Sequence, residues 1–200
     1  MISICTPSLK GSGVTQTLGG LEFVSSNISG IGAARKDLVE RSCGNLIIML
    51  DEDIKTSLEL FDFLRQINFG EFAMAYVDGH VSTRVFAIHR YDYNNTSGFD
   101  SSIKYVFEDG AFYVDAIKHG LKFRVVPPNL FSHKDHVNRT GDKRKFASWW
   151  EHSRMLVKYK NYVYPGLIGF FGLRSILKQP HIFLVKTVGT IYWILRSKTK

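Results

Sequence analysis

Leu46-Ile47-Ile48-Met49-Leu50, followed at once by Asp51-Glu52-Asp53, is the stretch that decides the fold. An unbroken apolar run of this length is typical of a central strand in a sheet that is covered on both faces. Two carboxylates at the end of such a strand can hold Mg²⁺ or Mn²⁺ and leave coordination positions open for diphosphate oxygens. A surface loop can also contain Asp-Glu-Asp by chance. The apolar run favours the metal site, because solvated acidic turns seldom follow a buried strand directly.

Strand and helix patterns alternate along the first half of the chain. Lys10 to Gly20 is rich in glycine, serine and threonine and is expected to be a loop or a weak helix. Thr56 and Glu59 are expected to form a capping box at the start of a helix. The other expected strands are 1–5, 21–24, 72–77, 84–88 and 122–126, and the other expected helices are 31–43 and 109–119. This order predicts an α/β/α sandwich with a mostly parallel central sheet.

Ligands of such sheets bind at the carboxyl ends of the strands, which places Thr6, Asp51, Asp53 and Asp109 on one rim. Glu108-Asp109 opens a helix, where carboxylates also act as caps and interact favourably with the helix dipole. The alternative is that Asp109 is a general base, which takes a proton from a hydroxyl nucleophile. Both interpretations suit the pattern.

Histidines follow the Pro127-Pro128 turn in a basic loop, where most histidines are simply solvated. Together with the acidic pair, His133 could be a third metal ligand, which Mn²⁺ accepts better than Mg²⁺ does. His136 is an equal candidate on chemistry alone.

Three segments of the chain resemble family 2-type glycosyltransferases of GT-A fold. Asn27 to Arg35 resembles the helix start that lies beside the nucleotide in that family, and Leu46 to Asp53 resembles its apolar strand and D-x-D motif. Gly98-Phe99-Asp100, Glu108-Asp109 and the strand before Pro127 resemble the acceptor-side block of the family, in the same order. The resemblance covers about residues 21–135, and it suits a compact viral or archaeal member.

The resemblance implies a donor site for a UDP- or GDP-sugar with Mn²⁺ or Mg²⁺. Asp53 would bind the metal directly, and Asp51 would contact the ribose or a metal-bound water. Gly32 and Arg35 would lie near the nucleotide diphosphate. Thr6 and Pro7 would border the base. These assignments apply only where the residues match the motif of the family.

On the acceptor side, the resemblance implies that Asp109 is the catalytic base and that His133 is the histidine that often follows the last core strand. The implied reaction is an inverting sugar transfer to a hydroxyl of a glycan, a lipid-linked sugar or a protein. One feature departs from the family. Only about fifteen residues separate Pro7 from the strand at Leu21, so either one strand–helix unit is lost or Met1 to Thr6 is the second strand.

The charge of the chain is uneven, although its net charge is +8. Residues 1–142, the expected catalytic domain, are slightly acidic, whereas residues 143–200 carry 12 Lys/Arg and a single acid, Glu151. This basic, helical C-terminal segment points to a polyanionic partner. Residues 161–200 are also apolar and aromatic, so they are expected either to pack on the catalytic domain or to lie on an anionic membrane surface, with Trp193 and Tyr192 at the headgroups.

Two other functions use features of this sequence. The basic segment, with its aromatic residues, could bind nucleic acid, although no recognised nucleic-acid motif is present and the body is slightly acidic. A metal-dependent sugar-phosphate nucleotidyltransferase would also use paired carboxylates, but no glycine-rich phosphate loop with a lysine supports it. Cys5 and Cys43 lack paired spacing, and no signal peptide is visible. A cytoplasmic protein is therefore expected, at the inner face of the membrane if the C-terminal segment binds lipid.

Overall fold

The structure is a computed structural model, and it describes residues 1–7, 15–18, 20–77, 80–104, 107–133, 150, 153–154 and 180–197. The chain forms two compact units. The first unit takes Met1–Lys104 and Glu108–Val137, and the second takes Tyr105–Phe107 and Asn138–Lys200.

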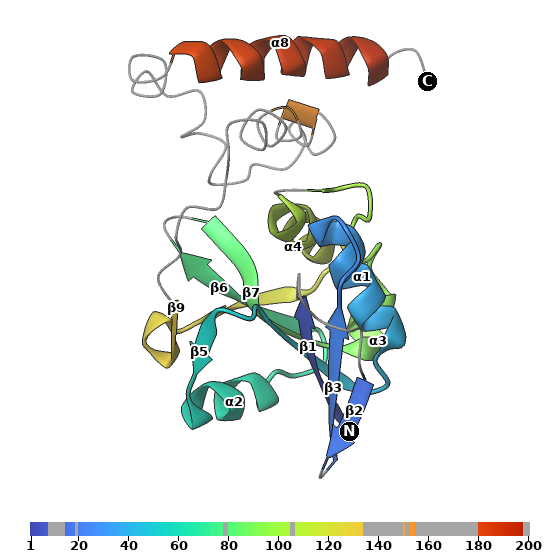
Figure 1. Ribbon diagram of the computed structural model, residues 1–200, viewed down its shortest axis with the longest axis vertical. Helices are drawn as coiled ribbons and strands as arrows, with labels where there is room; N and C mark the ends of the chain where they lie inside the picture. Colours follow the sequence, from blue (N-terminus) through green and yellow to red (C-terminus); the bar gives the residue numbers. More distant parts are fainter. Residues whose placement is uncertain are drawn as a thin grey trace. The chain divides into compact units, whose positions relative to one another are not determined.

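The first unit is built on a seven-stranded sheet with the order β2-β3-β1-β4-β7-β6-β8. Figure 1 shows β2, β3 and β1 side by side at one end of this sheet. Strand β1 runs parallel to its neighbours β3 and β4, and β6 runs parallel to β8. The β6–β7 hairpin joins antiparallel to β4, and β2 is an antiparallel edge. The strands are β1 (Ile2–Pro7), β2 (Thr15–Leu18), β3 (Leu21–Ser26), β4 (Leu46–Leu50), β6 (Glu71–Val77), β7 (His80–His89) and β8 (Lys122–Val126).

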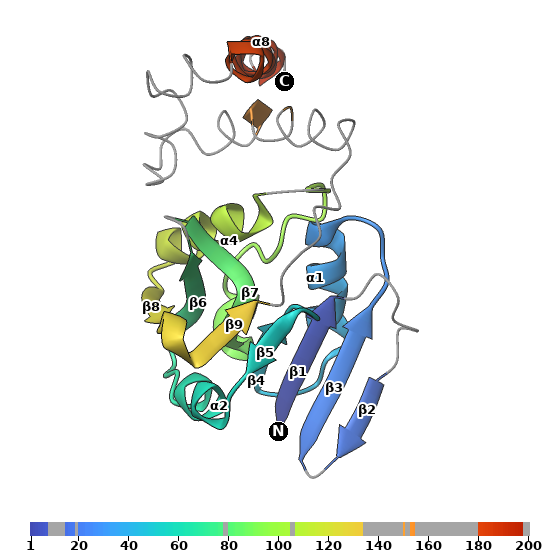
Figure 2. The ribbon, with the colours of Figure 1, turned by 60° about the vertical axis from the view of Figure 1, so that its left-hand side comes forward.

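Helices cover both faces of this sheet (Figure 2). Every residue of β4 is buried, as the apolar run predicts. On one face, Ile48 belongs to a core cluster with Leu60 and Leu64 of α2 (Leu58–Arg65). On the other face, Phe72 and Phe86 stack edge-on against Phe112, which lies in α4 (Glu108–Lys118). That face is also covered by α1 (Ile31–Arg41), and the short helix α3 (Arg90–Asn94) follows β7.

The connection from β1 to β3 explains the departure from the family pattern. Residues 15–18, predicted as loop or weak helix, form β2, which pairs with β3. The described residues of this connection contain an edge strand in place of a helix. Strand β3 therefore lies directly beside β1, and β1 lies directly beside β4.

The start of α2 corrects the predicted capping box. Thr56 lies in β5 (Ile54–Thr56), where it pairs with Phe131 of β9 (Phe131–His133). The helix begins at Leu58, so Thr56 lies one residue too early in the chain to be its N-cap. Ser57 is the N-cap instead, and its hydroxyl accepts a hydrogen bond from the Leu60 amide at 3.2 Å. The β5–β9 pair forms a separate two-stranded sheet, and β9 directly follows the 3₁₀ turn η1 (Pro128–Leu130).

The described part of the second unit is small. It comprises Phe107, the helical residues Trp150, Ser153 and Arg154, and the helix α8 (Pro180–Ser197). The sequence also predicts a long basic helix with Phe146, Trp149, Trp150, Ser153 and Leu156 on one face, and of these only Trp150 and Ser153 are among the described residues. In the part of the chain that the structure describes, no helix is both long and apolar enough to cross a bilayer.

Candidate active site

A buried arginine connects the two acidic clusters that the sequence singles out. Arg35 is only 2% exposed. Its Nη2 donates to Asp51 Oδ1 at 3.0 Å, and its Nε donates to Glu108 Oε1 at 3.3 Å. Asp51 directly follows β4, and Glu108 is the first residue of α4. The arginine therefore connects the end of the central strand β4 to the start of the helix that begins at Glu108.

The surroundings of Arg35 explain how a charged side chain is tolerated there. Burial alone would disfavour its charge, but the carboxylates of Asp51 and Glu108 outweigh that effect and raise the pKa of the guanidinium. Arg35 also donates to the Thr83 carbonyl at 3.3 Å, and the Thr83 hydroxyl donates to Glu108 at 3.4 Å. The bridge is thus a hydrogen-bonded network, which is the condition under which buried charges are stable.

Asp109 lies beside this network and has an unusual acidity. Its side chain is half-buried, and its Oδ1 accepts a hydrogen bond from the Gly110 amide at 2.8 Å. Burial, followed by the negative charge of Glu108, raises the pKa of Asp109 to about 8, while Arg35 opposes the shift. A carboxylate with a raised pKa at the rim of a sheet is well suited to general-base catalysis near neutral pH.

The backbone before this acidic pair is strained. Phe107 has a φ of 82°, a conformation that a bulky side chain rarely adopts. Such strain is often found at functional sites, where the surrounding structure holds it in place. The sequence carried no signal for it, because a phenylalanine gives no hint of a left-handed backbone.

The predicted metal ligands are assembled in part by the β5–β9 pair. Asp51 and Asp53 lie in the turn between β4 and β5, and both side chains are half-buried. His133 is paired through its backbone with Ile54, the residue after Asp53. The side chain of His133 and all of His136 lie outside the described residues, and the described residues alone contain no group of three potential ligands. Two carboxylates and a histidine are ligand types that Mn²⁺ accepts.

The predicted base-binding residues lie level with the acidic turn. Strands β1 and β4 are parallel with Cys5 opposite Met49, so Thr6 and Pro7 come beside the end of β4, where Asp51 begins the turn. Both are half-buried. The topology thus brings Thr6, Pro7 and Asp51 to one edge, while nucleotide contact by Thr6 and Pro7 stays a prediction.

At the start of α1, the backbone of Gly32 and the side chain of Arg35 both make hydrogen bonds within the protein. The Gly32 amide donates to the Ile103 carbonyl at 3.1 Å, and the Ile31 amide donates to the Lys104 carbonyl at 3.2 Å. These first helical amides are the groups that would otherwise be free to bind phosphate. Arg35 is fully engaged by its carboxylate partners. A direct role for Gly32 and Arg35 at the diphosphate, as the resemblance implies, remains a prediction, and the structure gives each residue a structural role.

Replacing Gly32 with alanine should destabilise the fold strongly. A Cβ at this position would lie 2.1 Å from the Asp100 carbonyl oxygen and 3.0 Å from that of Ile103, both of which are backbone atoms. We expect a loss of about 1–3 kcal/mol in the free energy of unfolding, as for other overpacked sites. Urea denaturation measures it. As a matched control, Gly70→Ala has open space around its Cβ, so only the strain of its φ of 78° should appear; equal losses would contradict the packing argument.

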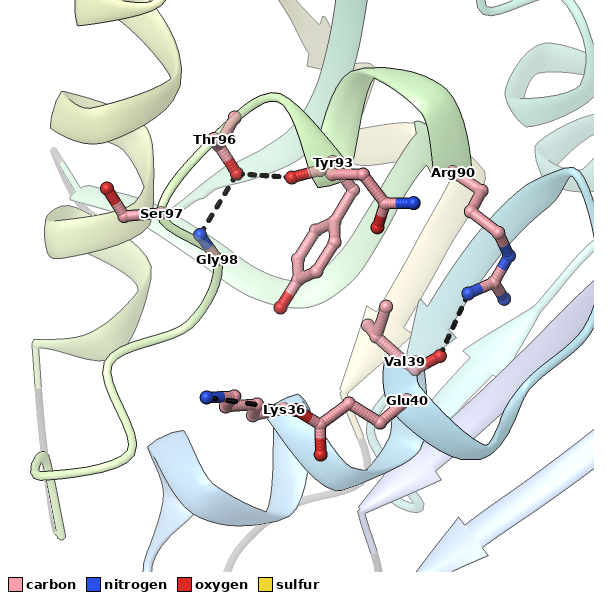
Figure 3. A pocket seen from close by; sticks show the side chains of 9 residues that line it. Lys36, Val39, Glu40, Arg90, Tyr93, Thr96, Ser97 and Gly98 are labelled. Carbon is pink, nitrogen blue, oxygen red and sulfur yellow. Dashed lines mark hydrogen bonds and ion pairs between the residues drawn. The ribbon is translucent and has the colours of Figure 1, made fainter.

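One pocket of about 210 Å³ lies away from the acidic rim, between α1 and α3 (Figure 3). Its cationic side chains already have partners. Lys36 is ion-paired with Glu40 at 3.7 Å, and Arg90 donates to the carbonyls of Gly44 and Val39 and to Ser42. Because Arg90 thereby holds the end of α1 to the loop before β4, we assign the pocket no ligand.

Solved structures of two glycosyltransferases are similar to this chain. No protein-family model and no curated protein match the sequence. A solved structure of the mannosyltransferase PcManGT from Pyrobaculum calidifontis, in complex with GDP-Man and Mn²⁺, matches with a TM-score of 0.54 at 10% identity, covering 94% of this chain and 73% of that one. The catalytic domain of Drosophila β1,4-galactosyltransferase 7, in complex with xylobiose, matches with a TM-score of 0.49 at 15% identity, covering 72% and 77%.

The similarity to solved structures concerns the fold of the chain. The match to the mannosyltransferase, with a TM-score of 0.54 at 10% identity, shows a shared fold. Nothing in these comparisons assigns the chain to family 2. The predicted fold class is nevertheless confirmed: the chain has a mixed α/β fold with a mostly parallel central sheet, like that of GT-A-type glycosyltransferases.

Proposed function

We propose that this protein is an inverting, metal-dependent glycosyltransferase that moves a sugar from a nucleotide-sugar to a hydroxyl acceptor. The observation that carries the proposal is the Arg35 bridge. It joins Asp51 of the donor-side turn to Glu108, the neighbour of the candidate base, at the carboxyl edge of a GT-A-like sheet. Fold likeness to a mannosyltransferase supports the same function.

On the donor side, Asp51, Asp53 and His133 would hold Mn²⁺ or Mg²⁺. The bound metal would act as a Lewis acid on the departing nucleoside diphosphate. The likeness to a protein solved with GDP-Man and Mn²⁺ supports a nucleotide-sugar donor and a metal in general terms. We propose a UDP- or GDP-sugar, with Thr6 and Pro7 bordering the base and Gly32 and Arg35 supporting the diphosphate side. Arg35 acts there as a positioning residue, since it is buried behind Asp51.

On the acceptor side, Asp109 would accept the proton of the acceptor hydroxyl. The hydroxyl oxygen forms a bond to the anomeric carbon as the bond from that carbon to the diphosphate oxygen breaks. The nucleoside diphosphate leaves with the bonding electrons, and the anomeric configuration inverts. The acceptor would be a glycan, a lipid-linked sugar or a protein hydroxyl.

The raised pKa of Asp109 predicts a pH dependence for this reaction. Asp109 can accept a proton only when it is ionised, and its pKa is about 8. We therefore expect kcat/KM to rise about tenfold per pH unit below that value and to level off above it. Initial rates with a fixed donor and acceptor, measured across this range, test the expectation. A profile already flat at neutral pH would remove Asp109 as the base.

Release of nucleoside diphosphate from a panel of UDP- and GDP-sugars tests the proposed function itself. Each donor is assayed with Mn²⁺, with Mg²⁺ and with a chelator, with simple sugars and detergent-dispersed lipid-linked sugars as acceptors. Acceptor- and metal-dependent release of UDP or GDP is the expected result. Release of pyrophosphate from a nucleoside triphosphate and a sugar phosphate would instead identify a nucleotidyltransferase.

A further inference from the structure

Helix α8 carries a bare aliphatic stripe on one side. Leu184, Val188, Ile191 and Leu195 are 63%, 51%, 54% and 61% exposed. Their spacing of four, three and four residues places them on a single face of the helix. We call these four residues the α8 stripe.

The opposite side of α8 is packed. Gly189 is buried, and a Cβ there would lie 2.9 Å from the Ser153 hydroxyl and 3.2 Å from Trp150. Trp150 also contacts the rings of Tyr192 and Trp193, at centroid distances of 5.3 and 6.4 Å. The helix therefore has one face that is occupied by protein and another, apolar face that is bare.

The charge of the C-terminal sequence indicates what covers the stripe. Residues 143–200 carry 12 Lys/Arg and a single acid, and Arg196 is exposed on α8 itself. Such a charge would repel the same segment of a second copy. Nucleic acid would suit the charge but offers no partner for an aliphatic stripe. An anionic bilayer surface matches both features, because it takes up apolar side chains and attracts cations.

We propose that the α8 stripe inserts into the surface of an anionic membrane and that α8 lies parallel to the bilayer. Of the two aromatic residues predicted to sit at the headgroups, Tyr192 is 43% exposed, whereas Trp193 is half-buried. Trp193 contacts Trp150 and lies under the guanidinium groups of Arg154 and Arg196, so the aliphatic stripe, rather than Trp193, is the inserting element. This inference does not depend on the proposed sugar transfer.

Vesicle flotation of the full chain tests the inference. We expect binding to vesicles of phosphatidylcholine mixed with phosphatidylglycerol, weaker binding to phosphatidylcholine alone, and a decrease with rising salt. The double substitution Val188→Asp and Ile191→Asp should lower the partition coefficient on the order of tenfold or more. Leu58→Asp is the matched control, because Leu58 is 81% exposed in the other unit and should leave binding unchanged.

A second measurement covers the case in which the double variant misfolds. A polarity-sensitive dye on Val188→Cys, in a Cys43→Ser background, should shift to the blue when anionic vesicles are added, whereas the dye on Leu58→Cys should not. Absence of vesicle binding, equal binding by the double variant, or a stripe-dependent dimer in sedimentation equilibrium would each overturn the proposal. The proposal would also be overturned if the wild type bound an oligonucleotide in a salt-sensitive way and the double variant lost that binding.

Discussion

Replacing Asp109 with asparagine should reduce sugar transfer by about 10²–10⁴-fold while nucleotide binding is retained. Asparagine has nearly the shape of aspartate and can still accept the hydrogen bond from the Gly110 amide, but it cannot take the proton of the acceptor hydroxyl. Turnover is measured by nucleoside diphosphate release, and nucleotide binding by calorimetry. Asp62→Asn, on the exposed side of α2, is the control and should be silent. Wild-type turnover in Asp109→Asn would show that the base is another group.

The same substitution should not lower stability at alkaline pH. The pKa of Asp109 is raised from 3.8 to about 8 on folding, so its contribution to stability is complete only below the lower value and is lost as the pH rises towards the upper one. An uncharged asparagine avoids that loss. Thermal unfolding at about pH 8 should therefore show Asp109→Asn at least as stable as the wild type, which separates a catalytic defect from a folding defect.

Replacing Arg35 with methionine should cost about 3–5 kcal/mol in the free energy of unfolding. The substitution keeps an apolar stem of similar length but leaves Glu108 buried and Asp51 half-buried without the cation that compensates them. Urea denaturation gives the size of the loss. Arg41→Met is the control, because Arg41 is a third exposed and its ion pair with Asp37 lies within one helix. A loss of similar size in both variants would contradict the special role of the bridge.

Replacing Arg35 should also change the pH dependence of kcat/KM, which the loss of a purely structural residue would not do. Its positive charge opposes the raised pKa of Asp109, so in Arg35→Met that pKa should rise further. The pH at which kcat/KM levels off should then move upwards. Arg35→Lys keeps the charge, and it should shift this pH less than methionine does. An unmoved pH profile in a folded Arg35→Met protein would limit Arg35 to a structural role.

Much of the sheet is predictable from the sequence because its signals are local. Strand β4 is an unbroken apolar run, β8 ends at two prolines, and α4 begins with an acidic pair and ends near Gly120. Strand β2 was missed because its residues, Thr15–Leu18, resemble a loop and become a strand only by pairing with β3. The Thr56 cap was wrong for the same reason, since its pairing partner, Phe131, is distant in sequence.

The sequence singles out the candidate site residues one by one, but it does not show which of them contact one another. The motif marks Arg35, Asp51 and Asp109, and the strand-end rule places the acids on one rim. No sequence pattern shows that Arg35 is buried, because arginine is rarely buried, and its partners lie 16 and 73 residues away. The role of Glu108 as a partner of Arg35 was missed, since helix capping explains a glutamate at that position equally well.

Thermal unfolding with UDP or GDP, each with and without Mn²⁺, tests the central claim most directly. A nucleotide at about 100 times its dissociation constant should add roughly 2.7 kcal/mol of stability, which for a chain of this size raises Tm by about 5–10 °C. The proposed site predicts that this shift requires both the metal and one of the nucleotides, disappears in Asp53→Ala, and survives in Glu52→Ala, the neighbouring residue of the same turn. The absence of a shift with either nucleotide, or an equal shift in Asp53→Ala, would contradict a metal-dependent nucleotide-sugar site at the end of β4.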